Sequence, residues 1–197
     1  STFGVRGLRI YVDGIPATLP DGQGQLSHID LGSAERIEVL RGPFSALYGN
    51  SSGGVVQVFT QQGEGSPVIT PSAAFGSHGF IRMGVHAMGS EGPLGYTLGV
   101  SQFSTNGYRA HSAASRSVGN ARLDWDVQDG GKFTLVVNQM RLRADDPLGL
   151  SRAQFDAAPR SADASALLFN TRKTVQQTQA GLVYEYPLEG GSQLRAM

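Results

Sequence analysis

Hydrophobic and polar positions alternate along most of the chain from residue 67 onward. The clearest case is residues 120–127, where one face of an extended strand carries Ala121, Leu123, Trp125 and Val127 and the other carries Asn120, Arg122, Asp124 and Asp126. The same alternation recurs over residues 81–87 and 179–186. A period of two residues predicts β-strands that have one apolar and one polar face.

Turn residues divide this region into strands joined by two kinds of connection. The expected strands lie near 67–76, 79–90, 95–105, 117–127, 132–143 and 172–186, followed by the start of a seventh. Apart from a short first connection, short and long connections alternate: 91–94, 128–131 and 187–191 are short, and 106–116 and 144–171 are long. Near Gln139 the apolar parity slips, which predicts a bulge or a strand end there.

This layout is typical of an outer-membrane β-barrel, in which short periplasmic turns alternate with longer extracellular loops. Aromatic side chains beside the short turns would form an interfacial girdle, and the sequence places Tyr96, Trp125, Tyr184 and Tyr186 there. A soluble sandwich or barrel with a one-sided core has the same alternation. The pattern alone therefore leaves a passive porin and a soluble β-rich binding module as alternatives.

Residues 1–63 have a different pattern and predict a small mixed α/β segment. Its expected elements are a strand at 8–12, a helical turn at 31–35 capped by Asp30, a strand at 36–41, a short helix at 43–48 and a strand at 55–60. The last strand is almost wholly apolar, which is typical of a strand buried on both faces. We therefore expect one domain over 1–63 and a second, antiparallel β-region over 64–197.

Composition narrows the classes of function. The 27 glycines are about twice the average usage and suit an all-β chain with many tight turns. The 16 basic and 16 acidic residues balance, so the broad basic surface of a nucleic-acid-binding protein is missing. The absence of cysteine excludes a disulfide framework and a thiolate metal site.

Neither catalysis nor metal binding has a convincing pattern. His28 with Ser27, Asp30 and Ser45 supplies the residue types of a catalytic triad, but no nucleophile elbow accompanies them. The histidines, which are His28, His78, His86 and His111, lack the spacing of metal ligands. We expect no enzyme activity, no cofactor and no metal site.

Several spaced motifs resemble the plug domain of TonB-dependent outer-membrane receptors. They are Arg6-Gly7, Tyr11-Val12-Asp13-Gly14-Ile15-Pro16, Ile37-Glu38-Val39-Leu40-Arg41-Gly42-Pro43, Ser45, Leu47-Tyr48-Gly49 and Gly53-Gly54-Val55-Val56-Gln57-Val58. The resemblance covers roughly residues 4–62, and the blocks occur in the order that the family has. It implies that 1–63 are the end of a plug and that 64–197 begin a transmembrane β-barrel of 22 strands. The chain would then be an internal piece of a receptor.

The resemblance also implies a function. Receptors of this family lie in the bacterial outer membrane, surrounded by its lipid, and import scarce, bulky nutrients with energy from TonB and its inner-membrane motor complex. The motor pulls on a short segment called the TonB box, which is absent from this sequence. The expected partners are therefore TonB and a small-molecule nutrient cargo.

Cargo recognition in the family belongs to the plug apex and the extracellular loops. The resemblance implies the following candidates: Asp21, Gln23 and Gln25 at the apex, and His78, Tyr108, Arg109 and His111 in the loops. Residues 5–25 are particularly similar to the YncD/PqqU-like subgroup, which implies pyrroloquinoline quinone, a small tricarboxylate, as the cargo. Arginine suits such a cargo because its planar fork binds a carboxylate bidentately. A ferric siderophore is the alternative.

A plug inside a polar lumen gives charged residues a second expected role. We expect the plug arginines to pair with inward carboxylates of the barrel: Arg6, Arg36 and Arg41 on one side, and Asp124, Asp126 and Glu185 on the other. Such pairs would hold the plug and still exchange for water when the motor pulls.

Overall fold

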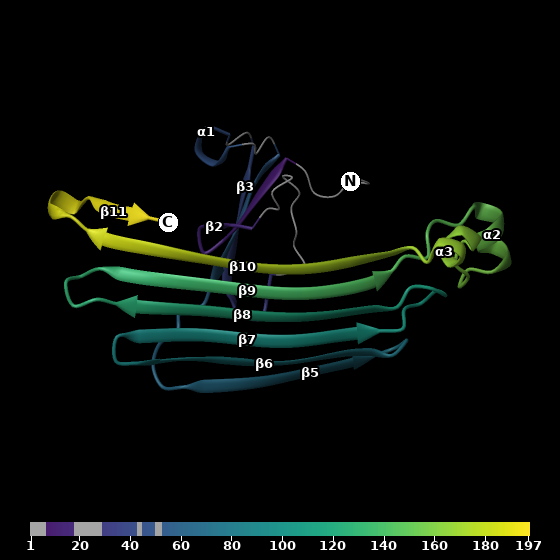
Figure 1. The fold of residues 1–197 in the computed structure, drawn as a ribbon, viewed down its shortest axis with the longest axis horizontal. Helices are drawn as coiled ribbons and strands as arrows, with labels where there is room; N and C mark the ends of the chain where they lie inside the picture. Colours follow the sequence, from purple (N-terminus) through teal and green to yellow (C-terminus); the bar gives the residue numbers. More distant parts are fainter. Residues whose placement is uncertain (1–6, 18–28, 43–44, 50–52) are drawn as a thin grey trace.

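The chain folds into a small sheet and a large sheet. The computed structural model describes residues 7–17, 29–42, 45–49 and 53–197. Four strands form the first sheet in the order β2-β1-β4-β3, and seven form the second in the order β11-β10-β9-β8-β7-β6-β5. In Figure 1, β1 and β3 run crosswise to the strands of the large sheet.

The small sheet comprises β1 (Leu8–Val12), β2 (Ile15–Pro16), β3 (Ala34–Arg41) and β4 (Gly54–Thr60), with the short helix α1 (Ser45–Tyr48) between β3 and β4. Strand β4 is central because it pairs with β1 in parallel and with β3 in antiparallel register. Ile10, Val12 and Val58 pack into a small core. Val55 and Val58 are both buried and face opposite sides of β4, in agreement with the predicted burial on both faces.

One expected element of the small sheet is wrong. Residues 31–35 form a turn followed by the start of β3, not a helical turn capped by Asp30. The Asp30 carboxylate instead accepts a hydrogen bond from the backbone N–H of Gly32, at 3.1 Å. An aspartate bonded to the backbone two residues on forms an Asx turn, which competes with helix initiation.

The large sheet confirms the predicted antiparallel strands. Its members are β5 (Val68–Gly76), β6 (Phe80–Glu91), β7 (Leu94–Thr105), β8 (Ala114–Asp126), β9 (Lys132–Asp145), β10 (Arg172–Pro187) and β11 (Gln193–Ala196). A short 3₁₀ turn, η1 (Glu189–Gly191), precedes β11. The mainly β fold class expected from the sequence is therefore confirmed.

The predicted irregularity near Gln139 is wrong. Strand β9 keeps an unbroken register with both β8 and β10 from Lys132 to Ala144. Gln139 and Arg141 lie on the same face as Leu135 and continue its row. The sequence change there is a change from apolar to polar on one face, and not a shift of the chain between faces.

The connections lie at opposite ends of the large sheet. In Figure 1 the tight turns are at one end, and the long connection that contains α2 and α3 is at the other. Helix α2 (Arg152–Ala157) begins with a capping box between Ser151 and Gln154, and α3 (Ala164–Phe169) is capped by Asp163. The sequence-based expectation of a plain loop missed both helices. Among the described residues, no helix has the length and apolarity needed to cross a membrane.

The two faces of the large sheet have different surroundings. The inner face contacts the small sheet and buries polar side chains, including Thr97, Arg122 and Asn138. The outer face exposes apolar side chains, and Trp125 is 54% exposed there. Because these apolar rows are exposed, they do not form the closed core of a soluble protein on that face.

The apolar rows of the outer face form an oblique band. On β5 and β6 the outward apolar side chains continue to Phe75 and Ile81, which pair at the loop end of the sheet. On β9 and β10 they stop at Val137 and Ala180, which pair much nearer the tight turns. Strands of a membrane barrel are tilted by about 35–45°, so a band level with the membrane must cross the paired rows obliquely.

Candidate functional site

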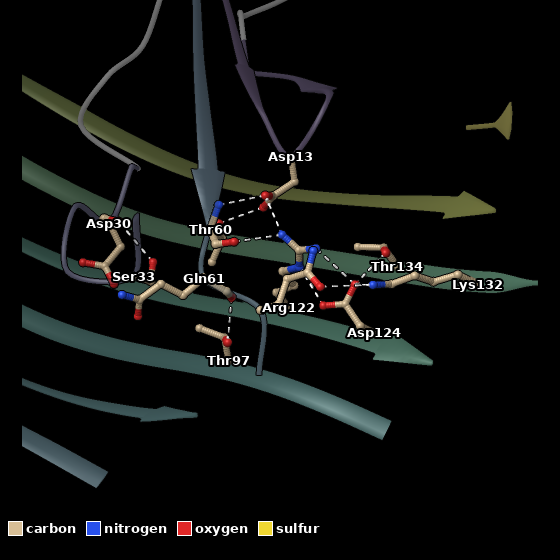
Figure 2. A network of polar contacts seen from close by, with 11 residues as sticks. Asp13, Asp30, Ser33, Thr60, Gln61, Thr97, Arg122, Asp124, Lys132 and Thr134 are labelled. Atoms are coloured by element: carbon tan, nitrogen blue, oxygen red, sulfur yellow. Dashed lines mark hydrogen bonds and ion pairs between the residues drawn. The ribbon is translucent and has the colours of Figure 1, made fainter. Parts of the chain in front are cut away.

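A buried guanidinium joins the two sheets. Arg122, on the inner face of β8, donates from Nη1 to Asp13 Oδ1 at 2.8 Å and to the carbonyl oxygen of Thr60 at 3.0 Å. Its Nε and Nη2 donate to the two carboxylate oxygens of Asp124, at 2.7 and 3.1 Å. Figure 2 shows Arg122 between the two carboxylates. The arginine therefore binds Asp124 of its own strand through Nε and Nη2, and it binds the small sheet through Nη1.

The carboxylate of Asp13 is held within the small sheet as well. Thr60 donates to it twice, from its backbone N–H to Oδ1 at 2.8 Å and from Oγ1 to Oδ2 at 2.7 Å. Asp13 and Gly14 both have positive φ, at 52° and 78°, as a two-residue turn between β1 and β2 requires. The turn thus presents the carboxylate to the large sheet in a fixed position.

Asp124 is held by further donors on the large sheet. Thr134 Oγ1 donates to its Oδ1 at 2.7 Å, and Lys132 Nζ lies 3.5 Å from the same oxygen. Lys132 Nζ also donates to Gln62 Oε1 at 3.3 Å, in the segment that follows β4. The charges alternate from Asp13 through Arg122 and Asp124 to Lys132, so the cluster carries no net charge.

Apolar contact between the sheets is small. Ile15 of β2 packs against Val136 and Val183 on the inner face of β9 and β10. Gly181 makes room for it, because a Cβ at Gly181 would overlap Ile15 Cδ1. Beside this contact, Gln179 Nε2 donates to the carbonyl oxygen of Pro16.

The segment between the sheets lies flat against β6 and β7. Thr97 Oγ1 donates to the carbonyl oxygen of Gln61 at 2.9 Å. A Cβ at Gly63 would overlap the carbonyl oxygen of Tyr96, and a Cβ at Gly95 would lie 2.5 Å from that of Gly63. Only glycine at 63 and 95 allows this close passage of two backbones.

The structure pairs the predicted charged residues differently from our expectation. Arg36 pairs with Glu38 of its own strand at 2.8 Å, and Glu185 pairs with Arg195 of β11 at 3.4 Å. Arg41 and Asp126 form no ion pair within the described residues, and Arg6 lies outside them. Of the expected group, only Asp124 takes part in the contact between the sheets, through Arg122. The charges are placed opposite to the expectation. The large sheet supplies the arginine, Arg122, and the small sheet supplies the carboxylate, Asp13.

The loop residues expected to bind cargo come together at the loop end of the large sheet. The rings of His78 and Tyr108 meet edge to face at 5.4 Å, and the guanidinium of Arg160 lies 5.2 Å from the Tyr108 ring centre. His111 Nε2 is within 2.8 Å of the carbonyl oxygen of Thr171. Asp21, Gln23 and Gln25 lie outside the described residues.

Arg109 is held by the longest connection. Its guanidinium donates to three backbone carbonyl oxygens, those of Ser161 at 2.9 Å, Leu148 at 2.8 Å and Pro147 at 3.3 Å. These bonds use Nε and both terminal nitrogens. In this arrangement Arg109 positions the connection that contains α2 and α3. The guanidinium of Arg109 faces the backbone of that connection and not open solvent.

Two arginines that the sequence analysis did not select lie beside a cavity between the sheets. Arg82 of β6 and Arg116 of β8 face inward in the same row, with Phe103 of β7 between them. A cavity of about 260 Å³ is bounded by these arginines and by apolar side chains of the small sheet and the residues before it: Ile29, Leu31, Ile37, Val56 and Val58. Alternation around 81–87 could have indicated that Arg82 faces inward. Its neighbours across the sheet could not be read from the sequence.

Comparison with known proteins identifies this arrangement of a small sheet docked on a β-wall. Residues 1–56 match the family described as the TonB-dependent Receptor Plug Domain. The chain is similar to the TonB-dependent receptors, with their plug domain over residues 1–56. The small sheet corresponds to part of the plug and the large sheet to part of the barrel wall of these receptors, which places the protein in the bacterial outer membrane.

Relatives and solved structures agree with this family. The chain is 37% identical over 95 residues to the vitamin B12 transporter BtuB of Photobacterium profundum, covering 46% of this chain and 15% of that protein. Over 67 residues it is 39% identical to BtuB of Vibrio vulnificus, covering 34% of this chain and 11% of the relative. These relatives are transporters and not enzymes.

The fold agrees over almost the whole chain. The unliganded ferric citrate transporter FecA superposes with a TM-score of 0.70 at 26% identity, over 93% of this chain and 30% of FecA. The ferric yersiniabactin uptake receptor FyuA from Yersinia pestis superposes with a TM-score of 0.71 at 18% identity, over 93% of this chain and 30% of FyuA. The chain therefore spans less than a third of these receptors.

Proposed function

We propose that the complete receptor imports a scarce, bulky nutrient across the outer membrane, and that TonB supplies the energy by displacing the plug. The observation that supports this function is the docking of the plug through the Asp13–Arg122 pair. An immobile plug would be expected to dock through an extensive apolar core. Here the cluster of buried apolar residues that joins plug and wall within the described residues is small and consists of Ile15, Val136 and Val183.

The charge cluster is arranged so that both charged groups of the Asp13–Arg122 pair stay hydrogen-bonded when the plug leaves. If Asp13 moves away with the plug, its carboxylate keeps both hydrogen bonds from Thr60. Arg122 remains on the wall with both of its bonds to Asp124. Breaking a buried pair is costly mainly when one charge is left without compensation. Arg122 thus keeps its counter-ion Asp124 and Asp13 keeps two hydrogen bonds, and water replaces the two hydrogen bonds that Arg122 made to the plug.

We further propose that the cargo is anionic, because Arg82 and Arg116 border the cavity between plug and wall. Pyrroloquinoline quinone, with its carboxylates, is the cargo we favour, and a ferric siderophore is the alternative. Guanidinium groups bind carboxylates and other oxyanions through paired hydrogen bonds. The apolar side of the cavity suits a planar or apolar body on the same cargo.

Uptake measurements test the energised mechanism. Cells that produce the complete receptor should accumulate labelled cargo when TonB is present and lose this uptake when TonB is deleted. Cargo binding to the same cells should persist, because binding does not need the motor. Equal uptake with and without TonB would contradict active transport and would favour a passive pore.

Binding measurements test the cargo. The purified receptor should be titrated with pyrroloquinoline quinone and with a panel of ferric siderophores. Arg82→Ala and Arg116→Ala should each weaken binding of the true cargo by about 1.5–3 kcal/mol, the size of a hydrogen bond to a charged group. Arg152→Ala is the matched control, since Arg152 lies exposed on α2 and pairs with Asp156. Siderophore binding without quinone binding would overturn the favoured cargo and leave the receptor function intact.

Replacement of the apex candidates adds an independent check. Gln23→Ala and Gln25→Ala should each weaken cargo binding by about 1–3 kcal/mol if their amides contact the cargo. Unchanged affinity in both variants would remove the apex residues from the binding site. It would not affect the test of Arg82 and Arg116.

A further inference from the structure

The outer face of the barrel wall carries a groove that the transport function does not use. It has a volume of about 590 Å³ and crosses β6, β7, β8 and β9. Its outward-facing lining residues are Met83, Val85, Val100, Gln102, Ser117, Gly119, Gln139 and Arg141. A Cβ at Gly119 would meet no atom within 4 Å, so the glycine leaves an open depression in the wall. Every lining strand has both of its neighbours, so the groove is complete within this chain.

The groove lies across the edge of the apolar band. Its middle row pairs Val100 with Gly119 and Gly119 with Gln139. The row nearer the tight turns consists of Leu98, Ala121 and Val137, and the row nearer the loops consists of Gln102, Ser117 and Arg141. The groove therefore adjoins apolar side chains on the side of the tight turns, and its end near the loops is lined by polar and cationic side chains.

The position of Arg141 along β9 agrees with the height of a membrane interface. Phe133 lies beside a tight turn, in a row with Trp125 and Tyr184, where an interfacial aromatic girdle is expected. Eight residues separate Phe133 from Arg141. At about 3.4 Å per residue and a tilt of about 45°, they span about 19 Å of membrane thickness, against an apolar band of about 25 Å. The backbone of Arg141 therefore lies about 6 Å inside the edge of the apolar band, from where its long side chain reaches the headgroups of the outer leaflet.

The charge at this edge is positive. Arg141 and Arg143 both face outward on β9, and Arg172 faces outward on β10 opposite Asp145. The only ion pair of these three arginines within the described residues is a long contact of Arg143 with Asp145, at 3.9 Å. Three arginines against one carboxylate leave an excess of positive charge beside the polar end of the groove.

We propose that this groove binds a lipid that carries phosphate groups, from the outer leaflet of the membrane. One acyl chain lies over Gly119, between Val100 on β7 and Gln139 on β9. The phosphate accepts hydrogen bonds from Arg141, with Arg143 close by. A guanidinium binds phosphate bidentately, and a basic residue at a membrane surface favours an anionic headgroup. The proposal needs only the barrel wall and its membrane, so it does not depend on the cargo or on TonB.

Lipid binding by the purified complete receptor tests the proposal. Diphosphoryl lipid A is the probe, monophosphoryl lipid A is the matched lipid with less phosphate, and inorganic phosphate is the competitor without acyl chains. Binding should be tighter to the diphosphoryl form and should resist inorganic phosphate. Arg141→Gln should weaken it by about fivefold or more, from the loss of one surface cation. Gly119→Leu should weaken it by filling the depression.

Two control variants separate the site from general effects. Arg152→Gln removes a cation from helix α2, and Ala180→Leu adds three carbon atoms to the outer face of β10, against four in Gly119→Leu. Both should bind the probe within about twofold of the unaltered receptor, because neither borders the groove. Equal binding of the two lipids, or unchanged binding after both Arg141→Gln and Gly119→Leu, would overturn the proposal. Displacement by inorganic phosphate alone would also overturn it, since it would show an anion site without a lipid.

Discussion

The plug and the barrel wall are held in place by different means. Each central strand of the wall pairs with a neighbour on both sides, and the wall exposes its apolar rows outward, where the membrane supplies the apolar environment. The plug has a small core of its own around Ile10 and Val58, and its described polar contacts with the wall centre on Arg122. The wall thus derives its position from backbone pairing and lipid, whereas the position of the plug depends on a few side chains. The plug is the part that single substitutions should displace.

The largest effect is expected when the shared guanidinium is removed. Arg122→Met leaves the buried carboxylate of Asp13 without a cation and Asp124 with only the longer contact to Lys132, which should destabilise plug docking by about 3–5 kcal/mol. The denaturant midpoint for plug unfolding in the complete receptor measures this loss. Adding Asp13→Asn to the same variant should recover part of it, because the plug then carries no unpaired carboxylate and Asp124 still pairs with Lys132. A single variant as stable as the unaltered receptor would show that the cluster does not hold the plug.

A smaller effect is expected at the apolar contact. Gly181→Val places a side chain where Ile15 packs and should cost about 1–3 kcal/mol through overpacking. The same denaturant measurement applies. Combining it with Ile15→Ala should restore part of the stability, since the smaller residue makes room. Equal stability of the Gly181→Val variant would mean that β2 does not rest on β10.

Within the wall, replacing Arg109 should have a local effect that leaves the plug unchanged. Arg109→Ala removes three hydrogen bonds to the backbone of the connection between β9 and β10. We expect faster amide exchange over residues 147–161, by a local loss of about 1–3 kcal/mol, with no change in plug stability. Arg152→Ala breaks only an exposed pair and should change exchange little. Reduced cargo affinity at unchanged exchange would instead assign Arg109 to the cargo.

The smallest effect concerns pH at helix α3. The backbone N–H of Ser165 donates to Asp163 and holds the pKa of this carboxyl below its ordinary value. A group with a lowered folded pKa contributes stability above its unfolded pKa and loses it as pH falls through the folded pKa. Amide exchange in 164–169 should therefore quicken, after correction for intrinsic rates, only when acid protonates Asp163. Asp163→Asn should remove this pH dependence, and a persistent dependence would assign it to another group.

The sequence predicted the wall better than the docking of the plug. Alternation fixed the faces of β8, because residues two apart must share a face. Helices α2 and α3 were missed because each has only six residues and little apolar period, although Ser151 and Asp163 are typical N-cap residues. The Asp13–Arg122 pair joins residues 109 positions apart. Its partners depend on how two sheets pack, and local pattern carries no information about that.

The central claim is that the plug separates from the wall during transport, and a reversible cross-link tests it most directly. The side chain of Ile15 and a Cβ at Gly181 are close enough for Ile15→Cys with Gly181→Cys to form a disulfide, and the chain has no cysteine of its own. Cargo uptake should stop when the pair is oxidised and return after reduction, while each single variant transports under both conditions. Undiminished uptake by the fully oxidised receptor would contradict the claim.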